Sequence, residues 1–219
     1  MPAAVVVLVI MGFIVVIAGV IVWTIARERK RTDAMRQVAD QLGIDFDPEA
    51  RDMPPADLAQ SHLFQLGRSR GAKNLLHTAR RDREVALFDY SYVIRHGNSS
   101  TRYRQTVAAF PVRSGRLPAF QLRPEGLLHR IGELFGYQDI DFHEDYDFSA
   151  KFLVKGRDEE AVRGLLTDRR RRACLDAGNV CVEGNEGWLI VYRAHRRVPA
   201  EEIARFLDEA RELARAFVG

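Results

Sequence analysis

The sequence has few of the residues and motifs that covalent chemistry or tight metal binding requires. It contains only two cysteines, Cys174 and Cys181, which are too far apart for a CxxC motif and have no histidine at metal-ligand spacing. In a cytoplasmic domain we expect both thiols to be reduced and structural. No dinucleotide-binding fingerprint occurs, and the six histidines are scattered along the chain. The sequence therefore indicates no particular reaction.

Charge is absent from the first 26 residues. The run from Val5 to Ala26 has 22 residues, of which 15 are Val, Ile, Leu or Phe. At about 1.5 Å per residue this helix would be about 33 Å long, which matches the roughly 30 Å hydrocarbon core of a bilayer. A cleaved signal peptide would instead have a basic start, a shorter apolar run and a clear cleavage site. We therefore expect residues 5–26 to be a transmembrane helix in contact with the lipid bilayer.

Positive charge is concentrated directly after this run, at Arg27, Arg29, Lys30 and Arg31. Basic residues beside a span favour the cytoplasmic side of the membrane. We therefore expect a single-pass protein of the bacterial inner membrane, with its N-terminus outside and the rest of the chain in the cytoplasm. At this depth the same four side chains can also contact anionic lipid.

Neither positive nor negative charge is in strong excess in this sequence. The 33 basic residues nearly balance the 30 acidic ones, and the formal net charge is +3. Such a balance gives no reason to expect a nucleic-acid partner. Only four of the basic residues are lysines, and this arginine bias is typical of a GC-rich bacterial genome.

The rest of the chain predicts one soluble α+β domain behind a juxtamembrane helix. Residues 27–43 can continue the membrane helix, with an apolar stripe at Met35, Val38 and Leu42 and a stop at Gly43. Residues 44–219 are long enough for a single hydrophobic core. We expect this domain to combine an antiparallel β-meander with packed amphipathic helices.

The first half of the domain shows the alternation of an antiparallel meander. After a short strand at 44–47, strands are expected over 74–80, 84–94, 103–112 and 119–122. Short polar turns separate the last four, so strands that are neighbours in the chain should be neighbours in the sheet. In the second of these four, the face that carries Phe88, Tyr90 and Tyr92 should be core.

The second half predicts helices and one further hairpin. The hydrophobic period indicates helices over 125–135, 158–166, 168–177 and 199–218, and strands over 148–154, 180–184 and 188–194. The last two strands are joined through Gly184 and Gly187, a strong hairpin signal. The last helix has one continuous apolar stripe, formed by Ile203, Phe206, Leu207, Ala210, Leu213, Ala214 and Phe217.

The acidic segment 139–147 contains the most specific candidate for a functional site. If it is extended, Asp139, Asp141 and His143 lie on one side, where oxygen and imidazole ligands could hold a divalent metal. The segment does not match a calcium-binding loop, because Glu144 stands where glycine is needed and Ala150 where the closing glutamate belongs. We therefore favour a solvated or capping acidic loop, and we expect no metal or other cofactor.

Two basic segments are candidate binding sites. Residues 67–74, GRSRGAKN, depart from the Walker phosphate-binding pattern in spacing and lack its hydroxyl, so an exposed basic turn is expected there. Arg169 to Arg172 would spread over every face of a helix, and we expect a solvated helix in preference to a lipid-binding surface.

Three segments share a pattern with known sequences: LPAFQLRPE at 117–125, QDIDF at 138–142 and FSAKFLVKGRDEEAVRGLL at 148–166. They resemble segments of uncharacterised bacterial single-pass membrane proteins that have a cytoplasmic domain of unknown function. The resemblance implies an N-terminal anchor and no catalytic residues. From sequence we therefore expect a membrane-anchored cytoplasmic domain that works by binding, as a scaffold or accessory factor for a protein partner that the sequence does not identify. The alternative is a membrane-anchored metal-dependent enzyme that uses residues 139–147.

Overall fold

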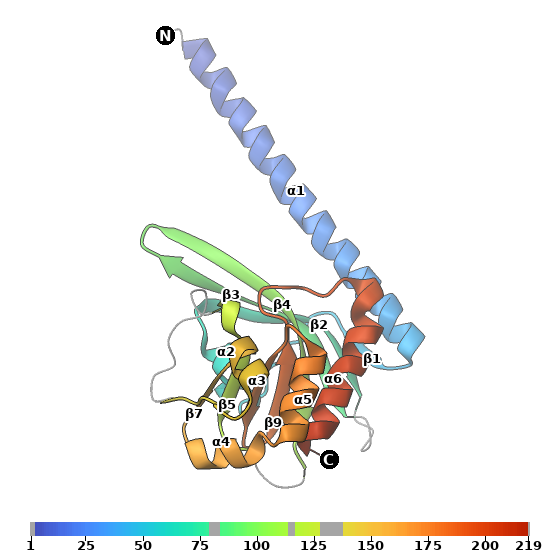
Figure 1. Cartoon of the computed structure of the whole chain (residues 1–219). Helices are drawn as coiled ribbons and strands as arrows, with labels where there is room; N and C mark the ends of the chain where they lie inside the picture. The colour runs from blue at the N-terminus through green and yellow to red at the C-terminus, as the bar shows by residue number, and fades with distance from the viewer. Residues whose placement is uncertain (1–2, 79–83, 114–116, 128–137, 219) are drawn as a thin grey trace.

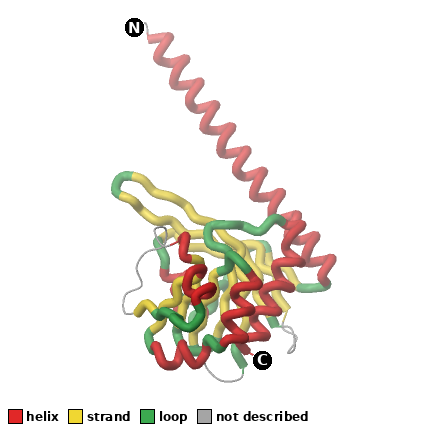
Figure 2. The backbone as a smooth tube through the Cα atoms, in the orientation of Figure 1, coloured by secondary structure: helices red, strands yellow, loops and turns green. Residues whose placement is uncertain are grey.

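One long helix and one mixed domain make up the chain in the computed structural model, which describes residues 3–78, 84–113, 117–127 and 138–218. Helix α1 (Ala3–Leu42) is continuous over 40 residues, and its N-terminal part projects away from the body of the protein (Figures 1 and 2). The large apolar side chains from Val7 to Ile25 are exposed there. By length and composition this helix could cross a membrane.

The body is built on a single antiparallel sheet, which has nine strands of different lengths among the described residues. Its strands are β1 (Asp45–Asp47), β2 (Arg68–Thr78), β3 (Val85–His96), β4 (Ser99–Pro111), β5 (Phe120–Pro124), β6 (Gln138–Asp139), β7 (Phe152–Gly156), β8 (Cys181–Asn185) and β9 (Trp188–Tyr192). Their order across the sheet is β1-β2-β3-β4-β9-β8-β5-β7-β6. The predicted α+β class, with an antiparallel sheet and packed helices, is confirmed.

Short helices cover both faces of the sheet. They are η1 (Leu58–Gln60), α2 (His62–Gln65), η2 (Glu125–Leu127), α3 (Tyr146–Lys151), α4 (Glu159–Leu165), α5 (Asp168–Ala177), η3 (Ala200–Glu202) and α6 (Ile203–Val218). Residues of α3, α4, α5 and α6 belong to the core on one face, and residues of η1 and α2 belong to the core on the other. Figure 1 shows α5 and α6 side by side against the sheet.

Strand β3 shows why there are two cores. Leu87 points into the core that α6 covers, whereas Phe88, Tyr90 and Tyr92 point into the core under α2. The predicted aromatic core face is confirmed, since these three rings are at most 2% exposed. The opposite face is buried as well at Val85, Leu87 and Asp89, because helices cover both sides of this part of the sheet.

The predicted meander is only partly correct. Strands β2, β3 and β4 are consecutive neighbours, as expected. The fourth predicted strand, β5, is not next to β4: β4 pairs with β9, and β5 pairs with β8 and β7. Strands β8 and β9 are buried along most of their length, so they occupy the centre of the sheet and separate β4 from β5.

Other elements can be compared directly with the sequence predictions. The hairpin of β8 and β9 forms as expected, and the apolar stripe of α6 is completely buried. Residues 148–151 belong to helix α3 and not to a strand, because Asp145 accepts a hydrogen bond from the Phe148 amide at 3.2 Å and caps a helix there. Of the helix predicted over 125–135, residues 128–135 lie outside the described part of the chain, and 125–127 form η2.

Candidate functional site

The second half of α1 is fixed to the domain. Met35, Val38 and Ala39 are buried in the core that α6 also lines, and the helix contacts β1, β2, η3 and α6. Of the predicted apolar stripe, Met35 and Val38 are buried, whereas Leu42 is exposed. The helix ends where expected, with Gly43 at φ +61°, a conformation that glycine adopts without steric cost. The C-terminal part of α1 is therefore part of the fold.

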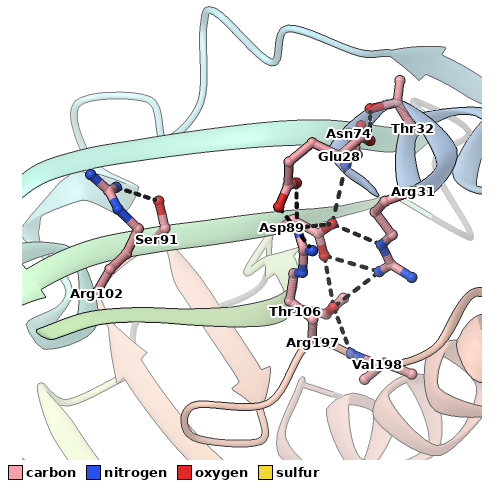
Figure 3. A network of polar contacts seen from close by, with 10 residues as sticks. All are labelled: Glu28, Arg31, Thr32, Asn74, Asp89, Ser91, Arg102, Thr106, Arg197 and Val198. Carbon is pink, nitrogen blue, oxygen red and sulfur yellow. Dashed lines mark hydrogen bonds and ion pairs between the residues drawn. The ribbon is translucent and has the colours of Figure 1, made fainter. Parts of the chain in front are cut away.

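A buried carboxylate, Asp89 of β3, is the centre of this junction (Figure 3). Arg31 of α1 binds it in a bidentate manner, with Nε 3.0 Å from Oδ2 and Nη2 3.0 Å from Oδ1. Asn74 Nδ2 donates to Oδ2 at 3.1 Å, and Thr106 Oγ1 donates to Oδ1 at 2.9 Å. Only 5% of Asp89 is exposed, and its carboxylate oxygens are hydrogen-bonded as a buried charge requires.

The two neutral donors extend the junction to further parts of the chain. Thr106 of β4 also accepts a hydrogen bond through Oγ1 from the Val198 amide, at 3.0 Å. Asn74 of β2 has φ +56°, and its own amide donates to the Pro48 carbonyl at 3.0 Å. Asp89 therefore ties together α1, β2, β4 and the segment that follows β9 (Figure 3).

A second ion pair reinforces this junction one helical turn closer to the apolar run of α1. Arg197 donates to both carboxylate oxygens of Glu28, at 2.7 and 3.2 Å. Its Nη1 also lies 3.9 Å from Asp89 Oδ2. Burial raises the pKa of Glu28, but the hydrogen bond and positive charge of Arg197 outweigh burial, and the net shift is downward. Glu28 and Asp89, the two carboxylates of this junction, are thus each bound by an arginine.

Sequence reasoning missed this junction because its partners are far apart in the chain. Arg31 is one of four basic residues beside the span, and nothing nearby distinguishes it from Arg29. The signal that could have found it is Asp89, an acidic residue inside an apolar and aromatic strand, which needs a buried cation. Glu28, Arg31 and Met35 have the helical spacing of one face, and this face is the one that meets the sheet.

Two cavities adjoin the junction. One has a volume of about 330 Å³ and lies beside Asp89, Glu28 and Lys73. The other has a volume of about 410 Å³ and lies between Trp23 of α1 and Arg104 of β4. Both are lined by Glu28 and by three arginines, Arg102, Arg104 and Arg197. The surroundings of the junction are therefore open and basic.

Most of the acidic segment 139–147 is exposed at the surface. Asp139, Asp141 and His143 are exposed and alternate with the buried Ile140 and Phe142, which is the alternation that the sequence predicts. Asp139 pairs with Lys155, whose Nζ lies 2.8 Å from Oδ1. Among the residues that the structure describes, no group of three or more His, Cys, Asp or Glu side chains is placed to hold a metal ion.

The basic segment 67–74 is not a turn but forms the start of β2. Residues 67–71 also have the spacing GxSxG, in which serine hydrolases place a nucleophile between a strand and a helix. Here Ser69, at φ +50°, lies at a break in register, and β2 pairs with β3 on both sides of it. Among the described residues that line the adjoining cavity there is no histidine that could serve as its base. The geometry is a β-bulge and not a nucleophile elbow.

The arginine run in α5 is partly structural. Arg171 is buried and binds Asp145 and Asp168, each at 2.8 Å, and Arg170 donates to the carbonyls of Leu165, Ala216 and Phe217. These two arginines hold α5 against α3 and α6, so the run is not a uniformly solvated face. Arg169 and Arg172 are exposed, as expected for a helix surface.

The two cysteines lie in different cores. Cys174 of α5 belongs to the core under α6, and Cys181 of β8 belongs to the core under α2. Both are free thiols, and burial raises the pKa of each to about 12. Their thiols are therefore protonated and unreactive at neutral pH.

Comparison with known proteins identifies a structural neighbour. No protein-family model and no curated protein matches the chain. The crystal structure of the mycobacterial trehalose monomycolate transport factor A, TtfA, is similar, with a TM-score of 0.58. The match covers 85% of this chain and 95% of that chain at 17% sequence identity. At this identity the similarity shows a shared fold.

The Arg31–Asp89 pair should contribute strongly to stability. Arg31→Met leaves a buried carboxylate without its bidentate cation, and we expect it to lower the free energy of unfolding by about 3 kcal/mol. Arg29→Met is the matched control, because Arg29 is exposed on the same helix, and it should change stability by no more than about 0.5 kcal/mol. Urea unfolding of the full chain in detergent, followed by tryptophan fluorescence, measures both. Equal effects of the two substitutions would contradict the role of Asp89 as the centre of the junction.

The acidic segment should not bind a specific metal. We expect zinc, manganese, magnesium and calcium each to leave the melting temperature of the EDTA-treated protein unchanged, because exposed and partly paired ligands bind such ions weakly. Thermal denaturation is compared with that of the Asp139→Ala/Asp141→Ala/His143→Ala variant. A gain of several degrees with one metal, absent from the triple variant, would instead favour the metal-dependent enzyme.

Proposed function

We propose that the chain is a membrane-anchored accessory or scaffold protein whose cytoplasmic domain binds a protein partner at the membrane surface. The observation that carries this proposal is the continuity of α1. One helix includes the exposed apolar run and the residues that are locked into the sheet. A binding domain on such an anchor is presented in a fixed orientation, whereas a domain on a flexible linker is not.

Residues 20–42 of α1 provide the physical basis for a fixed orientation. This part of α1 contains neither proline nor glycine, the usual causes of a sharp kink. Arg31 and Glu28 prevent rotation of the helix on the domain, because each is bound by two hydrogen bonds to its partner. Met35 and Ala39 are completely buried one and two turns further on.

The structural neighbour supports an accessory role. It is named as a transport factor, and it shares the fold over most of both chains. An accessory role also suits a domain whose polar centre connects structural elements. The metal-dependent alternative has no comparable support from the described residues.

The orientation and lipid contacts are part of the same proposal. The basic residues after the apolar run favour an orientation in which the domain is on the cytoplasmic side of the bacterial inner membrane and the N-terminus is outside. Arg27, Arg29 and Lys30 are exposed and are the members of the flank that would contact anionic lipid. Arg31 is not available for such contact, because its guanidinium binds Asp89.

The topology can be tested with C-terminal fusions. We expect an alkaline phosphatase fusion to be inactive and a fluorescent-protein fusion to be bright, because the basic flank keeps the domain in the cytoplasm. In Arg27→Gln/Arg29→Gln/Lys30→Gln this preference should weaken, while Arg31 is retained to preserve the fold. High phosphatase activity from the unmodified flank would reverse the orientation.

The fixed orientation can be tested by interrupting α1. We expect insertion of Gly-Ser-Gly-Ser after Arg27 to preserve the anchor and the domain but to lower the recovery of a specific partner in pull-downs from native membranes by at least about tenfold, because the insertion makes that helix segment flexible. The same insertion after Ala4 is the matched control and should leave recovery unchanged. Equal recovery with both insertions would exclude a need for orientation, and absence of any specific partner of the parent chain would exclude the scaffold role.

A further inference from the structure

The larger of the two cavities lies where the apolar run of α1 ends. It has a volume of about 410 Å³ and is lined by Trp23, Arg27, Arg102, Arg104, His195 and Arg197, among others. Trp23 and Arg27 come from α1, and Arg102 and Arg104 come from β4. The cavity is therefore formed between the membrane helix and the β3–β4 hairpin.

Its charge is strongly positive. Four arginines line it, and the one acidic residue among its described lining residues, Glu28, is already bound by Arg197. The Arg104 guanidinium makes no ion pair or hydrogen bond with a side chain among the described residues, although its charge helps to lower the pKa of Glu28, and Arg102 has one long hydrogen bond of 3.4 Å to Ser91 Oγ. Arg27 stacks over the Trp23 ring at 5.4 Å. The guanidinium groups of Arg27, Arg102 and Arg104 thus have no direct ion pair with a described carboxylate, which favours an anionic ligand.

The position of the cavity indicates where the anionic ligand comes from. The β3–β4 hairpin projects from the body toward the same side as the membrane helix (Figure 1). Trp23 is at the end of the apolar run, and tryptophan favours the headgroup layer of a bilayer. When the span is in a membrane, the cavity opens at the depth of the lipid phosphates, which Arg27 can reach with its long side chain.

We propose that this cavity binds the phosphate headgroup of an anionic phospholipid from the leaflet in which the span ends. Arg102 and Arg104 reach it from the hairpin, and Arg27 reaches it from the helix. The neighbouring cavity of about 330 Å³ shares Arg102, Arg104 and Arg197 and provides room for the polar part of a larger headgroup. This inference deepens the proposed lipid contact of the basic flank, because it names a site that includes residues far from the flank in sequence.

The site is tested on the full chain in detergent micelles by native mass spectrometry. Phosphatidylglycerol, phosphatidylcholine and inorganic phosphate are added in separate titrations. We expect phosphatidylglycerol to be retained in preference to phosphatidylcholine, and Arg102→Gln/Arg104→Gln to weaken its retention by about 30-fold, as the loss of two arginine contacts at a membrane surface predicts. Arg27→Gln should weaken retention by about fivefold to tenfold.

Arg169→Gln/Arg172→Gln is the matched control, since it removes the same charge from exposed positions on α5 that line neither cavity. It should leave retention unchanged, and the melting temperatures of all variants are compared with that of the parent. Equal losses in the control and in Arg102→Gln/Arg104→Gln, or equal retention of the two lipids, would overturn the site. Displacement of the lipid by millimolar inorganic phosphate would show a free-phosphate site instead. A micelle has no inside or outside, so these outcomes are independent of the topology and of the partner that the proposed function requires.

Discussion

The buried charge of Asp89 is the constraint on which the arrangement of the whole molecule depends. A carboxylate inside a sheet that is covered on both faces is stable only if donors surround it. Arg31, Asn74 and Thr106 meet this need from three different elements, and Thr106 in turn binds the backbone at Val198. The position of α1 on the sheet therefore follows from one residue of β3. The basic cavities exist because the same arginine-rich surroundings continue outward from this point.

The sheet explains why a small number of polar residues can organise so much of the fold. Both faces of its central part are buried, so the apolar side chains can pack in several ways with similar burial. Buried polar residues permit far fewer arrangements, because each needs partners with specific geometry. Glu183 of β8 is a second example: it is 1% exposed and accepts hydrogen bonds from the Leu63 amide, Gln121 and Tyr192. That residue holds α2 against the opposite face of the sheet.

The features that sequence patterns predicted are those determined by local periodicity. The stripe of α6, the hairpin through Gly184 and Gly187, and the end of α1 at Gly43 all follow from residues within a few turns or strands of one another. The separation of β4 from β5 could not be predicted in this way, because it depends on two strands that lie about 70 residues later in the chain. The helix at 148–151 was missed because a single cap, Asp145, outweighs the alternation of the following residues. The junction was missed because Arg31 and Asp89 are 58 positions apart.

The unbroken length of α1 has a mechanical consequence. A transmembrane helix that is longer than the local hydrocarbon layer tilts to keep its apolar residues covered. In this protein the tilting segment and the residues packed into the sheet belong to one rod, so the domain turns through the same angle. The β3–β4 hairpin lies away from the axis of that rod (Figure 1), and rotation therefore moves its tip as the end of a lever arm. With the apolar run in a bilayer, the thickness of that bilayer would therefore set the distance between the hairpin and the membrane surface.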